Sequence, residues 1–164
     1  MDQSKIRVMD IVPGTSVDGP GLRTSIYVAG CRHQCPGCHN PQTWEFSQGT
    51  PMTVDEIMQI VEENGFNVTL TGGDPMYSLP AIIPLIQAIN AAGYSIWLYT
   101  GFTYEQLLSL PDIDAILPSL EAIVDGPFEQ DKRDLSLSFR GSSNQRIIDV
   151  RNTLAYGEIV TFNY

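Results

Sequence analysis

Short apolar runs recur along the chain and predict five or six strands. They lie at residues 6–12, 24–29, 67–71, 94–99, 122–125 and, as a marginal sixth, 159–162. The first two runs are joined by a glycine-rich stretch at 13–21, a composition typical of turns. No internal repeat, low-complexity tract or long linker interrupts this pattern. The strands therefore belong to one continuous unit.

Apolar residues at helical spacing predict three helices between the later strands. The first covers 53–65, where Thr53 and Glu56 have the spacing of a capping box and a glycine ends the pattern. The second covers 80–93, with a proline near its start and a glycine at its end. The third covers 103–110 and begins with another capping-box pair.

Strands that alternate with helices predict parallel β-α-β units in a single α/β domain, residues 1–164. Ligands of such sheets bind beyond the carboxyl ends of the strands. The cysteine-containing loop after 24–29 and the loops at 72–75, 100–101 and 126–127 all follow strands, so we expect them on one edge. Five or six strands are too few for a closed eight-stranded barrel. The expected fold is a partial (β/α) barrel or an open curved, mainly parallel sheet.

Charge and composition exclude several classes of function. The formal net charge is −10, which disfavours a nucleic-acid backbone or an anionic membrane as partner. No apolar run is long enough for a transmembrane helix, and the first residues lack the apolar core of a signal peptide. Three cysteines without secretory features favour a reducing cytoplasm over a disulfide scaffold. We therefore expect a cytoplasmic protein.

All three cysteines, Cys31, Cys35 and Cys38, fall within eight residues of one loop. One interpretation is a structural zinc site with His33 or His39 as fourth ligand, although zinc usually draws its ligands from two separated pairs. A cysteine nucleophile is less favoured, because no base is committed to one thiol. The third interpretation is an iron–sulfur cluster, which takes soft thiolate ligands and would keep one iron open. His33, between two of the thiols, is expected to be exposed and without a chemical role.

The second motif is Gly72-Gly73-Asp74, directly after a predicted strand. Two glycines let the backbone approach a ligand closely, and the carboxylate of Asp74 suits a substrate ammonium group. The alternative is an ordinary tight turn. The position of this motif on the same edge as the cysteines favours a functional role. Trp97 and Tyr99 alternate along a strand and are expected in the core.

The spacing Cys-x3-Cys-x2-Cys at 31–38 resembles the signature of radical S-adenosylmethionine enzymes. The segment 18–23, Asp-Gly-Pro-Gly-Leu-Arg, resembles the one that precedes the cluster in glycyl-radical activating enzymes. Residues 71–75 resemble the glycine-rich motif that holds the methionine amino group. Further stretches resemble the branch of anaerobic (class III) ribonucleoside-triphosphate reductase activating proteins: 97–101, 124–128 and 140–146.

This resemblance implies an activity and a set of site residues. Cys31, Cys35 and Cys38 would bind three irons of a [4Fe–4S] cluster, whose fourth iron would bind S-adenosylmethionine. The S-adenosylmethionine contacts would be Gly37, Cys38, His39, Gly72, Gly73 and Asp74. Gly37 stands where the wider pattern often has an aromatic residue, so His39 is expected to supply the ring near adenine. The roles of Arg140 and Arg146 stay open.

The same resemblance implies the reaction and its partners. Reductive cleavage of S-adenosylmethionine would give a 5′-deoxyadenosyl radical, which would generate a glycyl radical on the large subunit of the anaerobic reductase. A flavodoxin-like or ferredoxin-like protein would donate the electron. Three rivals remain: an activase of another glycyl-radical enzyme of the pyruvate formate-lyase type, a non-catalytic zinc-binding module, and a simple electron carrier.

Overall fold

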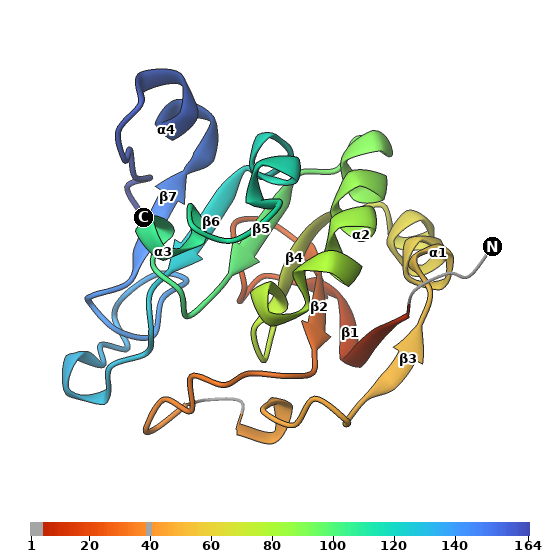
Figure 1. The fold of residues 1–164 in the computed structure, drawn as a ribbon, viewed down its shortest axis with the longest axis horizontal. Helices are drawn as coiled ribbons and strands as arrows, with labels where there is room; N and C mark the ends of the chain where they lie inside the picture. Colours follow the sequence, from red (N-terminus) through yellow and green to blue (C-terminus); the bar gives the residue numbers. More distant parts are fainter. Residues whose placement is uncertain (1–4, 39–40) are drawn as a thin grey trace.

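The computed structural model describes residues 5–38 and 41–164, and these form one open sheet of seven strands flanked by helices (Figure 1). The strand order is β3-β1-β2-β4-β5-β6-β7. The strands are β1 (Ile6–Thr15), β2 (Arg23–Val28), β3 (Thr50–Met52), β4 (Asn67–Gly72), β5 (Ile96–Tyr99), β6 (Ala122–Asp125) and β7 (Arg146–Asp149). The α-helices are α1 (Val54–Asn64), α2 (Leu79–Ala91), α3 (Tyr104–Leu107) and α4 (Val150–Tyr156).

The four central strands, β2, β4, β5 and β6, run parallel to one another. At one end of the sheet β1 pairs antiparallel with both β2 and β3, and at the other end β7 pairs antiparallel with β6. The predicted open α/β sheet is confirmed, and it does not close into a barrel. Its parallel part is the central four strands, and the strands at both ends of the sheet pair antiparallel with their neighbours.

Some elements differ from the prediction at the ends of the sheet. Strands β3 and β7 and helix α4 were not predicted. The three-residue β3 contains Pro51, which is unusual inside a strand, and β7 runs directly into α4 through Asp149, the N-cap of that helix. The stretch 159–162 forms a single bridge, between Thr161 and Ile148, rather than a strand. Helix α3 ends at Leu107, earlier than predicted, because the next turn bonds three residues back: Ser109 N donates to Gln106 O at 3.1 Å and Leu110 N to Leu107 O at 2.9 Å.

One face of the sheet packs against α1 and α2, which lie together on one side of the molecule in Figure 1, while α4 lies at the far end beside β7. The predicted apolar faces of α1 and α2 are buried in this core: Ile57, Met58, Val61, Ile82, Leu85, Ile86 and Ile89. Both predicted capping boxes form, with Thr53 and Thr103 each accepting a backbone N–H three residues on. No helix in the described part of the chain is long and apolar enough to cross a membrane.

The opposite face of the sheet is partly polar. Arg23 is buried at 2% exposure; its Nε donates to Thr69 Oγ1 at 2.9 Å and its guanidinium carbon lies 5.6 Å from the centre of the Trp97 ring. Asp18, in the segment before β2, accepts hydrogen bonds from Ser25 Oγ and the Tyr27 hydroxyl. Trp97 is fully buried, as predicted. Residues 18–23 therefore pack onto this polar face and are fixed there by side-chain bonds.

Candidate cluster and cofactor site

The loops that follow the parallel strands meet at one edge of the sheet, as predicted. Gly73 N donates to Val28 O and Asp74 N donates to Gly30 O, both at 2.8 Å, so the loop after β4 lies directly on the start of the cysteine loop. Gly126 N, after β6, donates to Phe102 O at 2.9 Å. In Figure 1 the orange cysteine loop runs along the edge at the bottom of the view, where the arrowhead of β2 ends.

Asp74 is the centre of this edge and is buried at 1% exposure. Its Oδ1 accepts the Met76 N–H at 3.0 Å, which caps the short 3-10 helix Pro75–Ser78. Its Oδ2 accepts from Thr100 Oγ1 and from the Gly101 N–H, both at 2.9 Å. A buried carboxylate is stable only when such donors surround it. Asp74 therefore ties the loop after β4 to the loop after β5.

His33 provides a further donor to the same carboxylate, which corrects the expectation that it is exposed. Its Nε2 lies 2.8 Å from Asp74 Oδ2, and its side chain is only 17% exposed. Its ring packs against Phe102, with ring centres 4.7 Å apart, and against Tyr77 at 5.1 Å. The sequence could not show this contact, because the two partners are 41 residues apart.

Close backbone approach explains the two glycines of the Gly72–Gly73 motif. Gly72 has φ of 114°, a conformation that side chains disfavour, and a Cβ there would overlap the backbone of Val28. A Cβ on Gly73 would lie 2.5 Å from Gly30 O and 2.8 Å from Thr43 O. Any side chain at 73 would therefore push the cysteine loop away from the sheet. The two glycines therefore allow the cysteine loop to pack closely against the end of the sheet, in addition to turning the chain.

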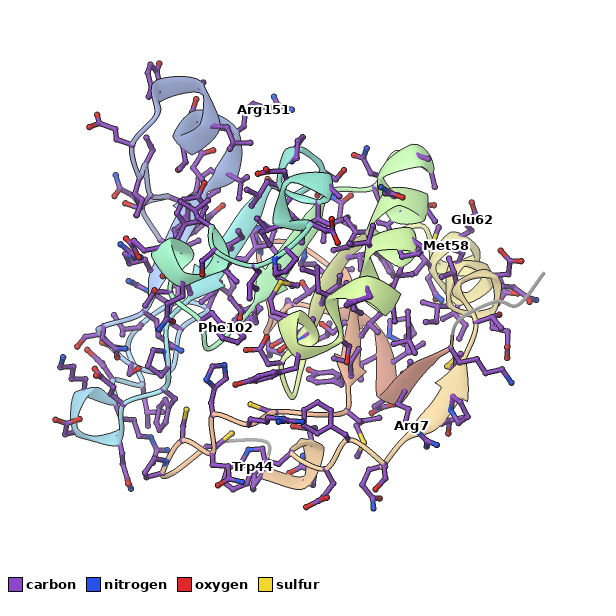
Figure 2. The ribbon with its side chains drawn as sticks, in the orientation of Figure 1. Arg7, Trp44, Met58, Glu62, Phe102 and Arg151 are labelled. Carbon is purple, nitrogen blue, oxygen red and sulfur yellow. The ribbon has the colours of Figure 1, made fainter. Side chains whose placement is uncertain are left out.

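The ends of the cysteine loop are fastened to each other. Gly30 N donates to Thr43 O at 2.7 Å and Cys31 N donates to Trp44 O at 3.1 Å. Figure 2 shows the labelled Trp44 on the returning segment of this loop and the labelled Phe102 on the side of the sheet. The loop therefore leaves the sheet and comes back to it within a short distance.

The three cysteines are all of intermediate exposure. Burial raises the pKa of the Cys31 thiol to about 11, and the backbone N–H of His33 works in the opposite direction. Burial also raises the pKa of the Cys35 thiol, while the backbone N–H of Phe128 opposes the shift. Between the second and third cysteines the chain turns, with Cys38 N donating to Cys35 O at 3.1 Å.

The three cysteine sulfurs are ligands of the type that an iron–sulfur cluster requires. Three thiols on one fastened loop are soft ligands, and backbone N–H groups near the sulfurs are a common feature of such sites. Among residues 5–38 and 41–164, no three His, Cys, Asp or Glu side chains stand grouped so as to hold a metal ion. Gly37 and Cys38 lie on the cysteine loop, and His39, the third residue of this loop predicted to contact S-adenosylmethionine, lies outside the described residues.

A second buried carboxylate, Asp125, organises the other half of the edge. It accepts from Arg146 at both oxygens, and Arg146 also pairs with Glu105 at 2.9 Å. Asp125 Oδ2 further accepts the Tyr104 N–H at 2.8 Å. Arg146, whose role was open, is therefore occupied by two carboxylates. The sequence does not reveal this cluster, because its charges come from three separate elements, β6, α3 and β7.

The stretch 140–146 builds the loop that reaches Cys35. Asn144 Nδ2 donates to Pro127 O at 2.8 Å, and Gln145 Nε2 donates to Gly126 O at 3.1 Å. These bonds hold the backbone just before Phe128, whose N–H lies near the Cys35 sulfur. In Figure 1 the light-blue segment after β6 comes down to the same edge as the cysteine loop. The motif at 140–146 thus supports the site from outside.

The comparisons with known proteins agree with this geometry. A family model described as a 4Fe-4S single cluster domain matches residues 17–148. The anaerobic ribonucleoside-triphosphate reductase-activating protein of Escherichia coli (strain K12) is 37% identical over 85% of this chain and 96% of its own. Its counterpart in Salmonella typhimurium is 35% identical over 89% and 100%. The protein of the same name in Enterobacteria phage T4 is 34% identical over 84% and 90%.

Among solved structures, the crystal structure of QueE from Escherichia coli aligns with a TM-score of 0.46 and 20% identity, over 62% of this chain and 53% of that one. That likeness is too weak to carry an argument. The family model, in contrast, extends across the three-cysteine loop, the Asp74 centre and the Asp125 cluster, and the relatives match most of the chain. The chain therefore belongs to the anaerobic ribonucleoside-triphosphate reductase-activating proteins, a family with a 4Fe-4S domain.

Proposed function

We propose that this protein activates an anaerobic ribonucleoside-triphosphate reductase by generating a glycyl radical on its large subunit. The activity is that of a radical S-adenosylmethionine oxidoreductase, related in type to the activating enzyme of pyruvate formate-lyase. The observation that carries the proposal is the meeting of the three-thiol loop with Gly72–Gly73 at one edge of the sheet, through hydrogen bonds of 2.8 Å. The names of the relatives support the choice of reductase over pyruvate formate-lyase as target.

Cys31, Cys35 and Cys38 are the proposed ligands of a [4Fe–4S] cluster. When bound, the reduced cluster supplies the electron that cleaves S-adenosylmethionine to a 5′-deoxyadenosyl radical. The chain itself contributes three thiolates on a loop whose ends are fastened at residues 30–31 and 43–44. Because burial raises the pKa of the Cys31 thiol, this thiol carries its proton at neutral pH in the metal-free protein and releases it when it binds iron.

Gly72 and Gly73 are proposed to bind the methionine end of S-adenosylmethionine through their backbone, together with Gly37, Cys38 and His39. Asp74 contributes a buried negative charge next to this backbone, which favours an ammonium group bound there. Its oxygens already accept four hydrogen bonds from the protein. Its main contribution is therefore to fix the loops. Its negative charge acts on the ligand electrostatically, through the loop backbone and without a direct hydrogen bond.

The partners are proposed from the same site. An open sheet leaves room for a loop of a protein substrate to reach the edge where the cofactors meet. A flavodoxin-like or ferredoxin-like protein is the proposed electron donor. Three cysteines close together on one loop with no secretory features fit a reducing compartment, so we place the protein in the cytoplasm.

The test is anaerobic reconstitution with iron and sulfide, followed by dithionite reduction and an assay for 5′-deoxyadenosine formed from S-adenosylmethionine. A brown protein that makes 5′-deoxyadenosine, and then a glycyl-radical signal on the anaerobic reductase in electron paramagnetic resonance (EPR), is the expected result. Pyruvate formate-lyase serves as the alternative substrate protein and should give no signal. A colourless protein that keeps zinc and forms no 5′-deoxyadenosine would favour the zinc-binding module instead.

A further inference from the structure

His33 lies in the middle of the cysteine loop, yet its side chain faces the sheet. Its Nε2 lies 2.8 Å from Asp74 Oδ2, and since a carboxylate only accepts, the ring nitrogen must carry a proton and donate it. The side chain is 17% exposed and its acceptor is 1% exposed. A hydrogen bond to a charged group that is shielded from water is stronger than one at the surface.

The surroundings of His33 restrict its ring to this position. Phe102 meets it edge-on, with ring centres 4.7 Å apart, and Tyr77 packs at 5.1 Å. Gly101 leaves space for it, because a Cβ on residue 101 would lie 2.5 Å from His33 Cδ2 and 2.7 Å from Nε2. Side chains from the loops after β4 and β5 therefore form a slot that the imidazole fills.

This contact joins the two halves of the proposed cofactor site. The cluster ligands belong to the loop after β2, whereas Gly72 and Gly73 belong to the loop after β4. S-adenosylmethionine has to reach both loops at once, so their spacing sets whether the ligand fits. Main-chain bonds from Gly73 and Asp74 hold only the start of the cysteine loop, at residues 28 and 30. The His33–Asp74 bond holds the loop further out, between the first two thiols.

We propose that His33 is a positioning residue: its hydrogen bond to Asp74 fixes the cysteine loop at a set distance from Gly72–Gly73, and so couples cluster geometry to S-adenosylmethionine binding. The proposal deepens the function proposed above and rests on it for the cofactor step. The fixing of the loop in the metal-free protein does not depend on that function. It can therefore be tested separately.

The test compares His33→Ala with His33→Gln, whose side-chain amide can donate from nearly the same place as Nε2. Gln34→Asn is the matched control, because residue 34 lies in the same loop, is exposed, and has φ of 50°, which Asn tolerates. The first measurement is the iodoacetamide alkylation rate of each cysteine in the metal-free protein, resolved by mass spectrometry. His33→Ala should speed alkylation of Cys31 and Cys35 at least fivefold, because the loop opens more often. His33→Gln and Gln34→Asn should stay within about twofold of the parent.

The second measurement uses the reconstituted holoprotein. His33→Ala should retain its iron content but bind S-adenosylmethionine about tenfold more weakly, equivalent to about 1.4 kcal/mol, as measured by equilibrium dialysis. The change that S-adenosylmethionine causes in the EPR spectrum of the reduced cluster should weaken in parallel. His33→Gln should recover most of both effects. A purely space-filling role would lower thermal stability without this separation of affinity from iron content.

The outcomes separate the two proposals. If the parent holoprotein binds no S-adenosylmethionine, the proposed function fails, and the alkylation rates still decide whether His33 fixes the loop. If His33→Ala leaves both alkylation and affinity unchanged, the positioning role is wrong. If His33→Gln is as defective as His33→Ala, packing in the slot matters and the hydrogen bond does not, which also overturns the proposal.

Discussion

Replacement of Gly73 by Ala should separate the cysteine loop from the sheet. The new Cβ would lie 2.5 Å from Gly30 O and 2.8 Å from Thr43 O, and both atoms belong to the backbone. A flexible side chain could rotate away from such a contact, but two carbonyl groups in a fastened loop cannot. The strain must therefore move the loop, the strand end, or both.

The cost can be worked from the bonds at this place. Overpacking by one methyl group in a tight site costs about 1–3 kcal/mol. The Gly73 N–Val28 O and Asp74 N–Gly30 O bonds, each 2.8 Å, contribute about 0.5–1.5 kcal/mol apiece if the movement breaks them. The free energy of unfolding should then fall by about 2–6 kcal/mol, a large part of the roughly 5–15 kcal/mol typical of a domain.

Urea unfolding of the metal-free protein under reducing conditions, followed by far-UV circular dichroism, measures this loss. Gly65→Ala is the control, since residue 65 has φ of 71° but no heavy atom within 4 Å of its new Cβ, so only backbone strain of about 1–2 kcal/mol applies. Gly73→Ala should also bind less iron on reconstitution, whereas Gly65→Ala should bind the normal amount. A Gly73→Ala protein as stable as the control, with full iron content, would refute the argument from close approach.

Three further predictions follow from the site. Replacing any one of the three cysteines by Ala should reduce 5′-deoxyadenosine formation at least a hundredfold while the metal-free protein keeps its circular dichroism spectrum; full activity in all three would contradict the ligand assignment. Arg146→Met should lower the free energy of unfolding by about 3–5 kcal/mol, because it leaves buried Asp125 without its counter-charge. Glu105→Gln, which changes the largely exposed partner of Arg146, should lower it by under about 1 kcal/mol. Equal losses in the two variants would be inconsistent with this difference in burial. In the metal-free protein at about pH 8, iodoacetamide should modify Cys31 at least tenfold more slowly than a small-molecule thiol, because a raised pKa leaves less of the reactive thiolate. The rate should rise as the pH approaches 11. A rate equal to that of a small-molecule thiol would show that burial does not perturb the pKa of Cys31.

The central part of the fold was predictable because its signals are local. Capping boxes at Thr53 and Thr103 and the apolar faces of α1 and α2 are set by neighbours three or four residues away, and both appear as expected. The order of strands and helices then places the loops on one edge through the geometry of parallel crossovers. The short outer strands β3 and β7 were not predicted, because they form through pairing with β1 and β6 and not through a strong local preference for strand.

The chemistry of the site was only partly predictable. The spacing of the cysteines and the two glycines marks the loops, and the close approach at Gly73 gives a physical reason for that motif. The partners of His33 and Arg146 could not be predicted, because each depends on side chains 21 to 41 residues away in sequence. Side-chain networks of this kind are defined only after the fold has brought distant residues together.

Two buried carboxylates organise the edge, and their burial explains why the loops are held so closely. Asp74 and Asp125 are each 1% exposed, and each follows or ends a parallel strand. A buried charge is tolerated only while its donors remain in place, and those donors come from neighbouring loops. Moving one loop away would leave a carboxylate partly unpaired, so the loops around each carboxylate tend to move together or not at all. The Gly126 N–Phe102 O bond then links the two carboxylate centres, so the loops after β4, β5 and β6 form one hydrogen-bonded support next to the cysteine loop.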